Sequence, residues 1–155
     1  MARIETILLA TDASSASSAA TLHAIDLAAR LDAQLVVLTV MSTAPRDKDP
    51  REVRANPVGR RDERTLAVQQ VVERARAEGA RATSLIWDGE PGEAIVEAAD
   101  SEAADLIVVG SHERSAVGRF FVGSVSDYVV RHARCPVMVV RGGTDRVRQG
   151  TPAAR

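Results

Sequence analysis

Short apolar runs alternate regularly with longer segments of helical period, and this alternation restricts the chain to few folds. The runs are rich in Ile, Leu and Val and lack a polar face, as expected for strands buried on both sides. Strands joined by helices in this way form a parallel sheet with helices on both faces. The sequence therefore predicts an α/β fold with strands at residues 4–10, 34–40, 81–87, 105–110 and 136–141.

Helices are predicted between these strands, within residues 14–31, 61–78, 88–103 and 123–132. In the first helix, apolar residues recur near helical spacing: Leu22, Ile25, Leu27 and Leu31. In the second helix, a set of apolar residues could face a core: Leu66, Val68, Val71, Val72 and Ala75. Gly79 follows this second helix and is a suitable residue for its C-terminal turn.

The length of 155 residues fits one domain, and no internal repeat divides it. We expect the domain to cover residues 1–143 and residues 144–155 to form a disordered tail. The polar segment 42–59 contains three prolines and is predicted to be a long loop.

Composition argues against several classes of function. The net charge is −1 and aromatic residues make up 3% of the chain, so nothing favours a nucleic-acid or anionic-membrane partner. No apolar run reaches transmembrane length and the first residues lack the pattern of a signal peptide, so we expect a cytoplasmic protein. The single cysteine, Cys135, excludes an internal disulfide and is expected to be a buried structural thiol.

Polar residues follow two of the predicted strands. The first strand ends in Ala10-Thr11-Asp12 and the fourth in Gly110-Ser111-His112. Ligands of doubly wound sheets bind at the carboxyl ends of the strands, where the strand order reverses. If these two strands are neighbours there, both segments face one crevice.

Within such a crevice, Gly110 would let the backbone approach a ligand, and Gly123-Ser124 would begin a helix whose free N–H groups favour an anion. Asp12 could hold Mg²⁺ beside phosphates or accept hydrogen bonds from ribose hydroxyls. Each residue also has a simpler interpretation. Gly110 could only terminate a strand, and Ser124 or Asp12 could only cap a helix.

Other polar residues in these segments favour ordinary roles. His112 stands alone in a loop without a paired nucleophile or metal partner, so an exposed and inert side chain is favoured. The serines before the first helix are interpreted as capping and first-turn residues: Ser14, Ser15, Ser17 and Ser18.

Three segments together resemble the universal stress protein family: ILLATDASSAS, DGEPGEAIVEAADSEAADLIVVGSH and GSVSDYVVRHARCPVMVVR. The resemblance extends over residues 3–141. It implies a Rossmann-like, adenine nucleotide alpha hydrolase-like fold with a five-stranded parallel sheet in the order 3-2-1-4-5. Strands 1 and 4 would then be neighbours at the reversal.

Nucleotide-binding members of this family carry the pattern G-x2-G-x9-G-[S/T] after strand 4 and bind ATP there. Here Gly110 matches the first glycine and Gly123-Ser124 the end, while Glu113 replaces the second glycine. The candidate set includes His112, Glu113 and Arg114, which lie inside this pattern. The resemblance also implies contacts by Ala10, Thr11 and Asp12 after strand 1, Val40 beside adenine, and Ser124, Val125 and Ser126 beside the phosphates.

Glu113 opposes nucleotide binding in two ways. A left-handed backbone at a residue other than glycine costs roughly 1–2 kcal/mol. A carboxylate about 4 Å from a phosphate costs about 1 kcal/mol in water and about 4 kcal/mol at an intermediate dielectric. Arg114 or Mg²⁺ would offset part of that charge.

The leading hypothesis is a universal stress protein that binds an adenine nucleotide, ATP with Mg²⁺, as a stress-response or signalling module. ATP, AMP and a cyclic nucleotide are not distinguished. An enzyme is not expected, although slow ATP hydrolysis stays open. The alternative is a family member that binds no nucleotide and acts as a dimeric interaction module.

Two further interpretations concern a related enzyme class and the oligomeric state. An ATP-pyrophosphatase is disfavoured because residues 10–15, Ala-Thr-Asp-Ala-Ser-Ser, lack that class's glycines. A homodimer is expected through the last strand, Pro136 to Arg141, because an unpaired apolar edge is an aggregation hazard.

Overall fold

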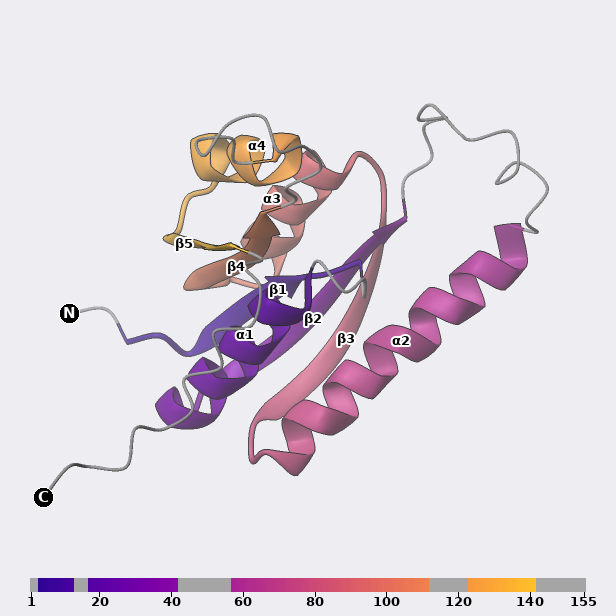
Figure 1. Ribbon diagram of the computed structural model, residues 1–155. Coiled ribbons are helices and arrows are strands. Elements are labelled where there is room, and N and C mark those ends of the chain that lie inside the picture. The colour runs from indigo at the N-terminus through magenta and orange to yellow at the C-terminus, as the bar shows by residue number, and fades with distance from the viewer. Residues whose placement is uncertain (1–2, 13–16, 42–56, 112–122, 142–155) are drawn as a thin grey trace, which may run out of the picture.

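The centre of the molecule is a parallel sheet with strand order β3-β2-β1-β4-β5. This computed structural model describes residues 3–12, 17–41, 57–111 and 123–141 (Figure 1). The strands are β1 (Thr6–Ala10), β2 (Gln34–Met41), β3 (Arg81–Asp88), β4 (Leu106–Ser111) and β5 (Val137–Arg141). The predicted fold class and strand order are confirmed.

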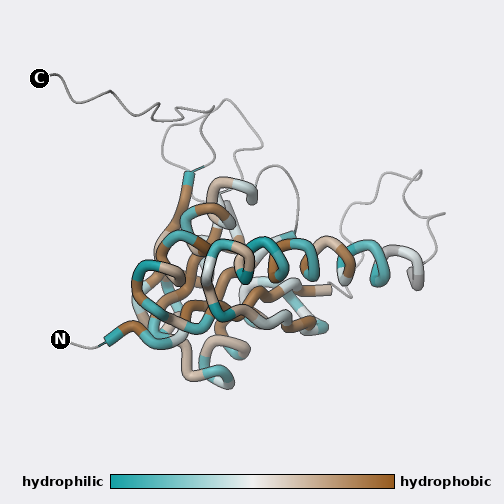
Figure 2. Tube along the Cα trace, turned by 90° about the horizontal axis from the view of Figure 1, so that it is seen from below, coloured by the Kyte–Doolittle hydropathy of each residue, from teal (hydrophilic) through white to brown (hydrophobic). Residues whose placement is uncertain are grey.

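Four helices in the described ranges connect the strands and cover both faces of the sheet. They are α1 (Ser18–Leu31), α2 (Pro57–Ala77), α3 (Pro91–Ser101) and α4 (Ser124–His132). Buried residues of α1 and α2 pack on one face, and those of α3 and α4 on the other. Figure 2 shows the hydrophobic strands inside and the hydrophilic turns of the helices outside, as an amphipathic cover requires.

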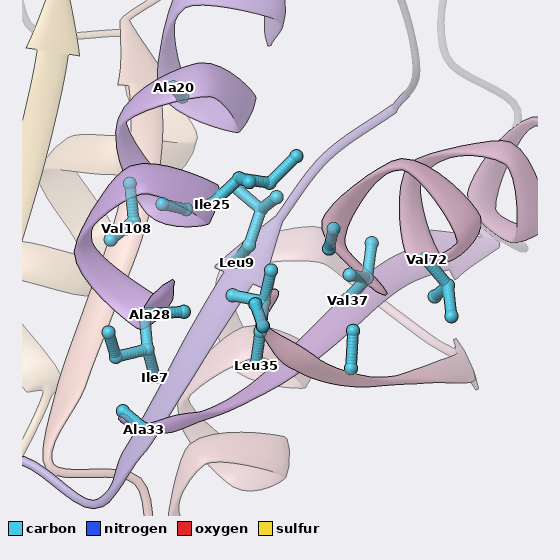
Figure 3. Packing of buried hydrophobic residues seen from close by; sticks show 14 of the residues in the cluster. Ile7, Leu9, Ala20, Ile25, Ala28, Ala33, Leu35, Val37, Val72 and Val108 are labelled. Carbon is cyan, nitrogen blue, oxygen red and sulfur yellow. The ribbon is translucent and has the colours of Figure 1, made fainter. Parts of the chain in front are cut away.

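Small residues let α1 lie close to the sheet. Ala20, Ala24 and Ala28 recur every fourth residue and are at most 1% exposed, so they form one buried stripe. Figure 3 shows two of these alanines, Ala20 and Ala28, in the cluster that includes Ile7 and Leu9 of β1.

The large apolar residues of α1 that recur near helical spacing do not all face the core. Ile25 is buried, but Leu22 and Leu31 are 46% and 41% exposed. The buried stripe is the alanine face, which a search for large apolar residues overlooks because alanine is small. Leu27 packs at the margin of this core.

Helix α2 begins earlier than predicted. It starts at Pro57, whereas the sequence predicted a loop through residue 59. Proline fits the first turn of a helix, since the N–H that it lacks has no intrahelical partner there. Leu66, a predicted core residue, is 64% exposed, while Val68, Val72 and Ala75 are buried as expected.

Gly79 has φ +91° and follows α2, so the predicted left-handed C-terminal turn is confirmed. Residues 42–56 of the predicted loop and the predicted tail, 144–155, lie outside the described residues.

A carboxylate fixes the start of the two strands that matter most for the site. Asp105, directly before β4, accepts hydrogen bonds through Oδ2 from the N–H groups of Glu5 and Thr6 at 2.8 and 2.9 Å. Its own N–H donates to the Thr6 carbonyl at 2.8 Å. These bonds set β1 and β4 side by side in a defined register.

The face covered by α3 and α4 depends on a close approach of the two helices. A Cβ atom on Gly92 of α3 would lie 2.7 Å from Cδ1 and 2.8 Å from Cγ of Tyr128 in α4. Gly92 is buried, and the Tyr128 ring is itself stacked on His132. The ring therefore has little room to withdraw.

Gly92→Ala should lower the free energy of unfolding by about 1–3 kcal/mol, because the added methyl overlaps the Tyr128 ring. Gly59→Ala is the matched control. No described heavy atom lies within 4 Å of a Cβ built on Gly59, and α2 should gain up to about 1 kcal/mol from the better helix former. Urea unfolding of both variants measures the difference, and equal effects would contradict the packing argument.

Cys135 lies between α4 and β5 and packs against the α3–α4 core. It is half-buried rather than fully buried as expected. Burial raises the pKa of the Cys135 thiol, and the carboxylates of Asp100 and Asp105 act in the same direction.

Cys135 should therefore react slowly with iodoacetamide at neutral pH, because a raised thiol pKa reduces the thiolate fraction. The rate in the native protein should rise with pH through a midpoint above that of the same protein unfolded in urea. A native midpoint at or below the unfolded one would contradict this expectation.

Candidate functional site

A pocket of about 210 Å³ opens at the carboxyl ends of β1, β2 and β4. We call it the crevice pocket. It lies where the strand order reverses, because β2 and β4 flank β1 on opposite sides. It is lined by Ala10, Thr11, Asp12, Ser17, Leu38, Val40, Arg64, Pro91, Ile95, Val109, Gly110, Ser111 and Val125.

One wall of the crevice pocket is apolar. Alternate residues of a strand point to the same face, which brings Ala10 of β1, Leu38 and Val40 of β2 and Val109 of β4 together under α3 and α4. Ile95 of α3 completes this wall. A flat apolar group would find van der Waals contact here.

The opposite rim is polar and centres on Ser17, the residue before α1. The hydroxyls of Thr11 and Ser17 are 2.9 Å apart, and Ser17 Oγ donates to Asp12 Oδ1 at 3.1 Å. Ser17 occupies the N-cap position, but its side chain makes no capping hydrogen bond. Ser17 and Ser18 therefore take the predicted cap and first-turn positions, while the Ser17 hydroxyl contacts the two predicted site residues, Thr11 and Asp12.

Ser111 brings an unsatisfied group to the pocket. It is the last residue of β4 and is 6% exposed, and its Oγ has no hydrogen-bond partner among the residues that the structure describes. The other such atom in the described residues is Thr39 Oγ1, which belongs to a residue outside the pocket lining. A buried hydroxyl without a partner is unusual and points to a missing ligand or water.

Arg64 of α2 reaches the pocket from the side of β2. Its Nη1 donates to the carbonyl oxygen of Val40 at 3.0 Å, in a partly buried position. Arg64 and Asp12 are the charged side chains among the lining residues that the structure describes. The pocket thus has a cation at its β2 side and a carboxylate beyond β1.

The start of α4 lies next to this pocket through Val125. Gly123 is the N-cap residue, so the interpretation of Ser124 as a cap was wrong: Ser124 is the first helical residue and is exposed. No side chain of the described residues caps this helix. Ser126 is buried, and its Oγ donates to the Gly123 carbonyl at 3.0 Å.

The predicted site residues divide into three groups. Residues that line the crevice pocket are Ala10, Thr11, Asp12, Val40, Gly110 and Val125. Residues at the start of α4, outside the pocket lining, are Gly123, Ser124 and Ser126. Residues outside the described part of the chain are His112, Glu113 and Arg114.

Sequence reasoning missed several lining residues. Leu38 and Val109 belong to apolar strands and gave no signal beyond burial. Ile95 and Arg64 are brought to the pocket by helices that are distant in sequence. Ser111 belongs to the segment Gly110-Ser111-His112 after the fourth predicted strand. Its position directly after Gly110 was the one sequence feature that pointed to the pocket.

Asp12, the predicted Mg²⁺ ligand, lies at the rim of the crevice pocket. Within the described ranges, no three His, Cys, Asp or Glu side chains lie close enough together to hold a metal ion. A carboxylate beside bound phosphates is nevertheless a common arrangement for Mg²⁺.

None of the helices described has the length and apolar character needed to cross a membrane.

Comparison with known proteins agrees with this architecture. A sequence model of the Universal stress protein family matches residues 3–141. A universal stress protein of Methanocaldococcus jannaschii is 32% identical over 137 residues, 87% of this chain and 81% of that protein.

Solved structures give the same assignment. Universal stress protein UspA from Lactobacillus plantarum has a TM-score of 0.75 at 30% identity, covering 91% of this chain and 100% of that one. A universal stress protein in complex with cAMP has a TM-score of 0.67 at 28% identity, with coverage of 90% and 98%. The matching sequence, the shared fold and these relatives establish that the chain belongs to the universal stress protein family.

Proposed function

We propose that the protein binds an adenine nucleotide in the crevice pocket and acts as a nucleotide-responsive stress or signalling protein. The observation that carries this proposal is Ser111, whose buried hydroxyl lines the pocket and has no partner within the described ranges. Leaving such a group unsatisfied costs about 1–3 kcal/mol, which a ligand hydrogen bond would recover. Support also comes from the related universal stress protein crystallised with cAMP.

The chemistry of the lining suggests how the ligand lies. The apolar wall around Val40 and Ile95 suits the faces of a base, and the Asp12 carboxylate suits ribose hydroxyls, which donate hydrogen bonds. The start of α4 presents N–H groups that no described side chain caps, and such groups favour phosphate.

The pocket volume is consistent with a ligand that is only partly enclosed. Its 210 Å³ is below the roughly 300–1,000 Å³ of pockets that enclose a whole drug-sized ligand. Base and sugar would occupy the pocket, and the phosphates would extend toward α4. With ATP, Asp12 and phosphate oxygens would hold Mg²⁺, since Mg²⁺ sites commonly combine one or two carboxylates with phosphates and water.

Ser111→Ala should weaken binding of Mg·ATP by roughly threefold to tenfold, because one hydrogen bond to the ligand is lost. It should leave the stability of the ligand-free protein unchanged or higher, because the hydroxyl has no partner there. Calorimetric titration of nucleotide-stripped protein with Mg·ATP, AMP and cAMP measures the affinities, and urea unfolding measures the stability.

Thr39→Val is the matched control. It removes the other buried hydroxyl that lacks a partner in the described part of the chain, at nearly constant shape. It should not change nucleotide affinity, because Thr39 does not line the pocket. Failure of every adenine nucleotide to bind at millimolar concentration would end the proposal. If the Glu113→Gly variant then bound a nucleotide that the wild type does not bind, the alternative hypothesis of a family member without nucleotide binding would be favoured.

The second candidate function, a dimeric interaction module, is favoured by the edge strand β5. Val137, Met138, Val139 and Val140 are each half-exposed along this edge. The Pro136 carbonyl accepts from Ile107 N–H at 3.0 Å, so the backbone groups of residues 136, 138 and 140 face β4. Those of Val137 and Val139 face outward, where β5 of a second copy could pair with them.

Val139→Pro should therefore convert a homodimer to a monomer, because it removes an outward-facing N–H and spares the bonds to β4. Light scattering at tens of micromolar measures the mass, and circular dichroism checks that the fold is retained. Val139→Ala is the control and should remain dimeric. A monomeric wild-type protein would rule out this dimer.

We further propose that the protein acts in the cytoplasm and is not an enzyme, with no nucleic-acid or membrane partner. Family membership supports a binding role, and slow ATP hydrolysis stays compatible with it. The domain is proposed to span residues 1–143.

A further inference from the structure

Helix α2 consists of two unlike halves. In the second half, Val68, Val72 and Ala75 are at most 2% exposed and belong to the core between the sheet and helices α1 and α2. In residues 57–67, none of the side chains that the structure describes is buried, and Leu66 is 64% exposed. Figure 1 shows this first half extending away from the sheet. We call residues 57–67 the α2 arm.

Helix propensity alone does not hold the α2 arm in place. Isolated helices shorter than roughly 12–15 residues are marginal in water. The first turn of α2 has no acidic residue to favour the positive end of the helix dipole, and Gly59 is a poor helix former. The Thr65 hydroxyl donates to the Arg61 carbonyl at 2.7 Å, a bond within the arm. The arm therefore depends on its contacts with the sheet.

Among the described side chains, two arginines join the α2 arm to the sheet. Arg61 Nη1 lies 3.2 Å from Asp88 Oδ1, and both side chains are more than half exposed, so this ion pair contributes little. Arg64 Nη1 donates to the Val40 carbonyl at 3.0 Å in a partly buried position. Hydrogen bonds from a charged donor are stronger than neutral ones, and water competes less here. Arg64 is thus the main tie between the arm and the sheet.

The same side chain connects the α2 arm to the crevice pocket. Arg64 is part of the pocket lining, whereas Arg61 and Asp88 are not. Opening of the arm would remove this guanidinium from the wall of the pocket. A ligand that contacts the complete wall binds the docked arm more tightly than the open one. By linkage, such a ligand shifts the arm toward its docked state.

We propose that the α2 arm is a conformational switch controlled by occupancy of the crevice pocket. With the pocket empty, the arm opens by local unfolding, and with an adenine nucleotide bound, Arg64 holds it on β2. Arg64 is then a positioning residue that acts on the arm. The inference rests on the proposed nucleotide function and gives that function an output, since the order of the arm reports whether the pocket is filled.

Hydrogen exchange of the full chain, measured by mass spectrometry, tests the switch. Without nucleotide, amides of residues 61–67 should exchange roughly tenfold faster than those of residues 68–77, whose side chains include the core residues. An adenine nucleotide at a concentration that saturates the protein in calorimetry should slow exchange in the arm by roughly tenfold. Equal exchange of the two halves without nucleotide would overturn the proposal.

Arg64→Met removes the guanidinium and keeps a good helix former. It should speed exchange in the nucleotide-free arm by roughly tenfold to a hundredfold, the effect of one lost hydrogen bond from a charged donor. Saturating nucleotide should no longer slow exchange in the arm of this variant. Arg64→Lys keeps a charged donor and should restore part of the protection, which a change in helix propensity alone would not do. Thermal melting checks that each variant is folded.

Arg61→Met is the matched control, because it removes the same charge from the same arm outside the pocket lining. It should change exchange in the nucleotide-free arm by less than about threefold, since the lost ion pair is exposed. Saturating nucleotide should still slow exchange in the arm of this variant.

The outcomes separate the switch from the nucleotide function. Nucleotide that binds without slowing exchange in the arm, or equal effects of Arg64→Met and Arg61→Met, would overturn the switch and leave nucleotide binding standing. Failure of every adenine nucleotide to bind the wild type would refute the proposed function, and the switch with it.

Discussion

The pairing of β1 on both of its sides is the constraint on which the rest of the structure depends. Ile7, Leu8 and Leu9 are 0% exposed, since β2 and β4 cover the edges of this strand and helices cover its faces. A strand buried in this way has to satisfy every backbone group within the sheet. Beyond Ala10, where β1 ends, the flanking strands continue without a strand between them, and a crevice results.

The crevice concentrates polar groups that the core could not accommodate. Ser111 ends β4 with a hydroxyl that has no partner among the described residues, Val40 offers a carbonyl to Arg64, and Asp12 follows β1. Each is a normal consequence of a strand that ends beside a shorter neighbour. The same local geometry therefore yields both the pocket and the groups able to recognise a ligand.

Much of this architecture could be predicted from the sequence, because buried parallel strands leave a strong local pattern. The runs that became β1, β2 and β4 have apolar residues on both faces, and the strand order followed from the family resemblance. The residues by which each helix packs on the sheet were less predictable. Leu22 and Leu66 repeat with helical period but are exposed, since the period alone does not distinguish which of two overlapping stripes meets the sheet.

Only those pocket residues that directly end or follow a strand could be predicted from the sequence. The segment after β1 and Gly110 carry local signals and do line the pocket. Arg64 and Ile95 carry none, because they reach it through the packing of whole helices, and the contact of Arg64 with Val40 joins residues 24 positions apart. Ser17 was assigned to helix capping because a serine before a helix usually has that role.

The pairing of β1 with β4 also has a consequence for the order of events during synthesis. Leu8 pairs with Ile107, about a hundred residues later in the chain, and Val125 follows still later. Contacts of such sequence separation form late, because closing a long loop is entropically costly. A nascent chain thus presents no complete crevice until α4 has left the ribosome. Any ligand of this pocket can stabilise the finished protein but cannot guide the folding of its first half.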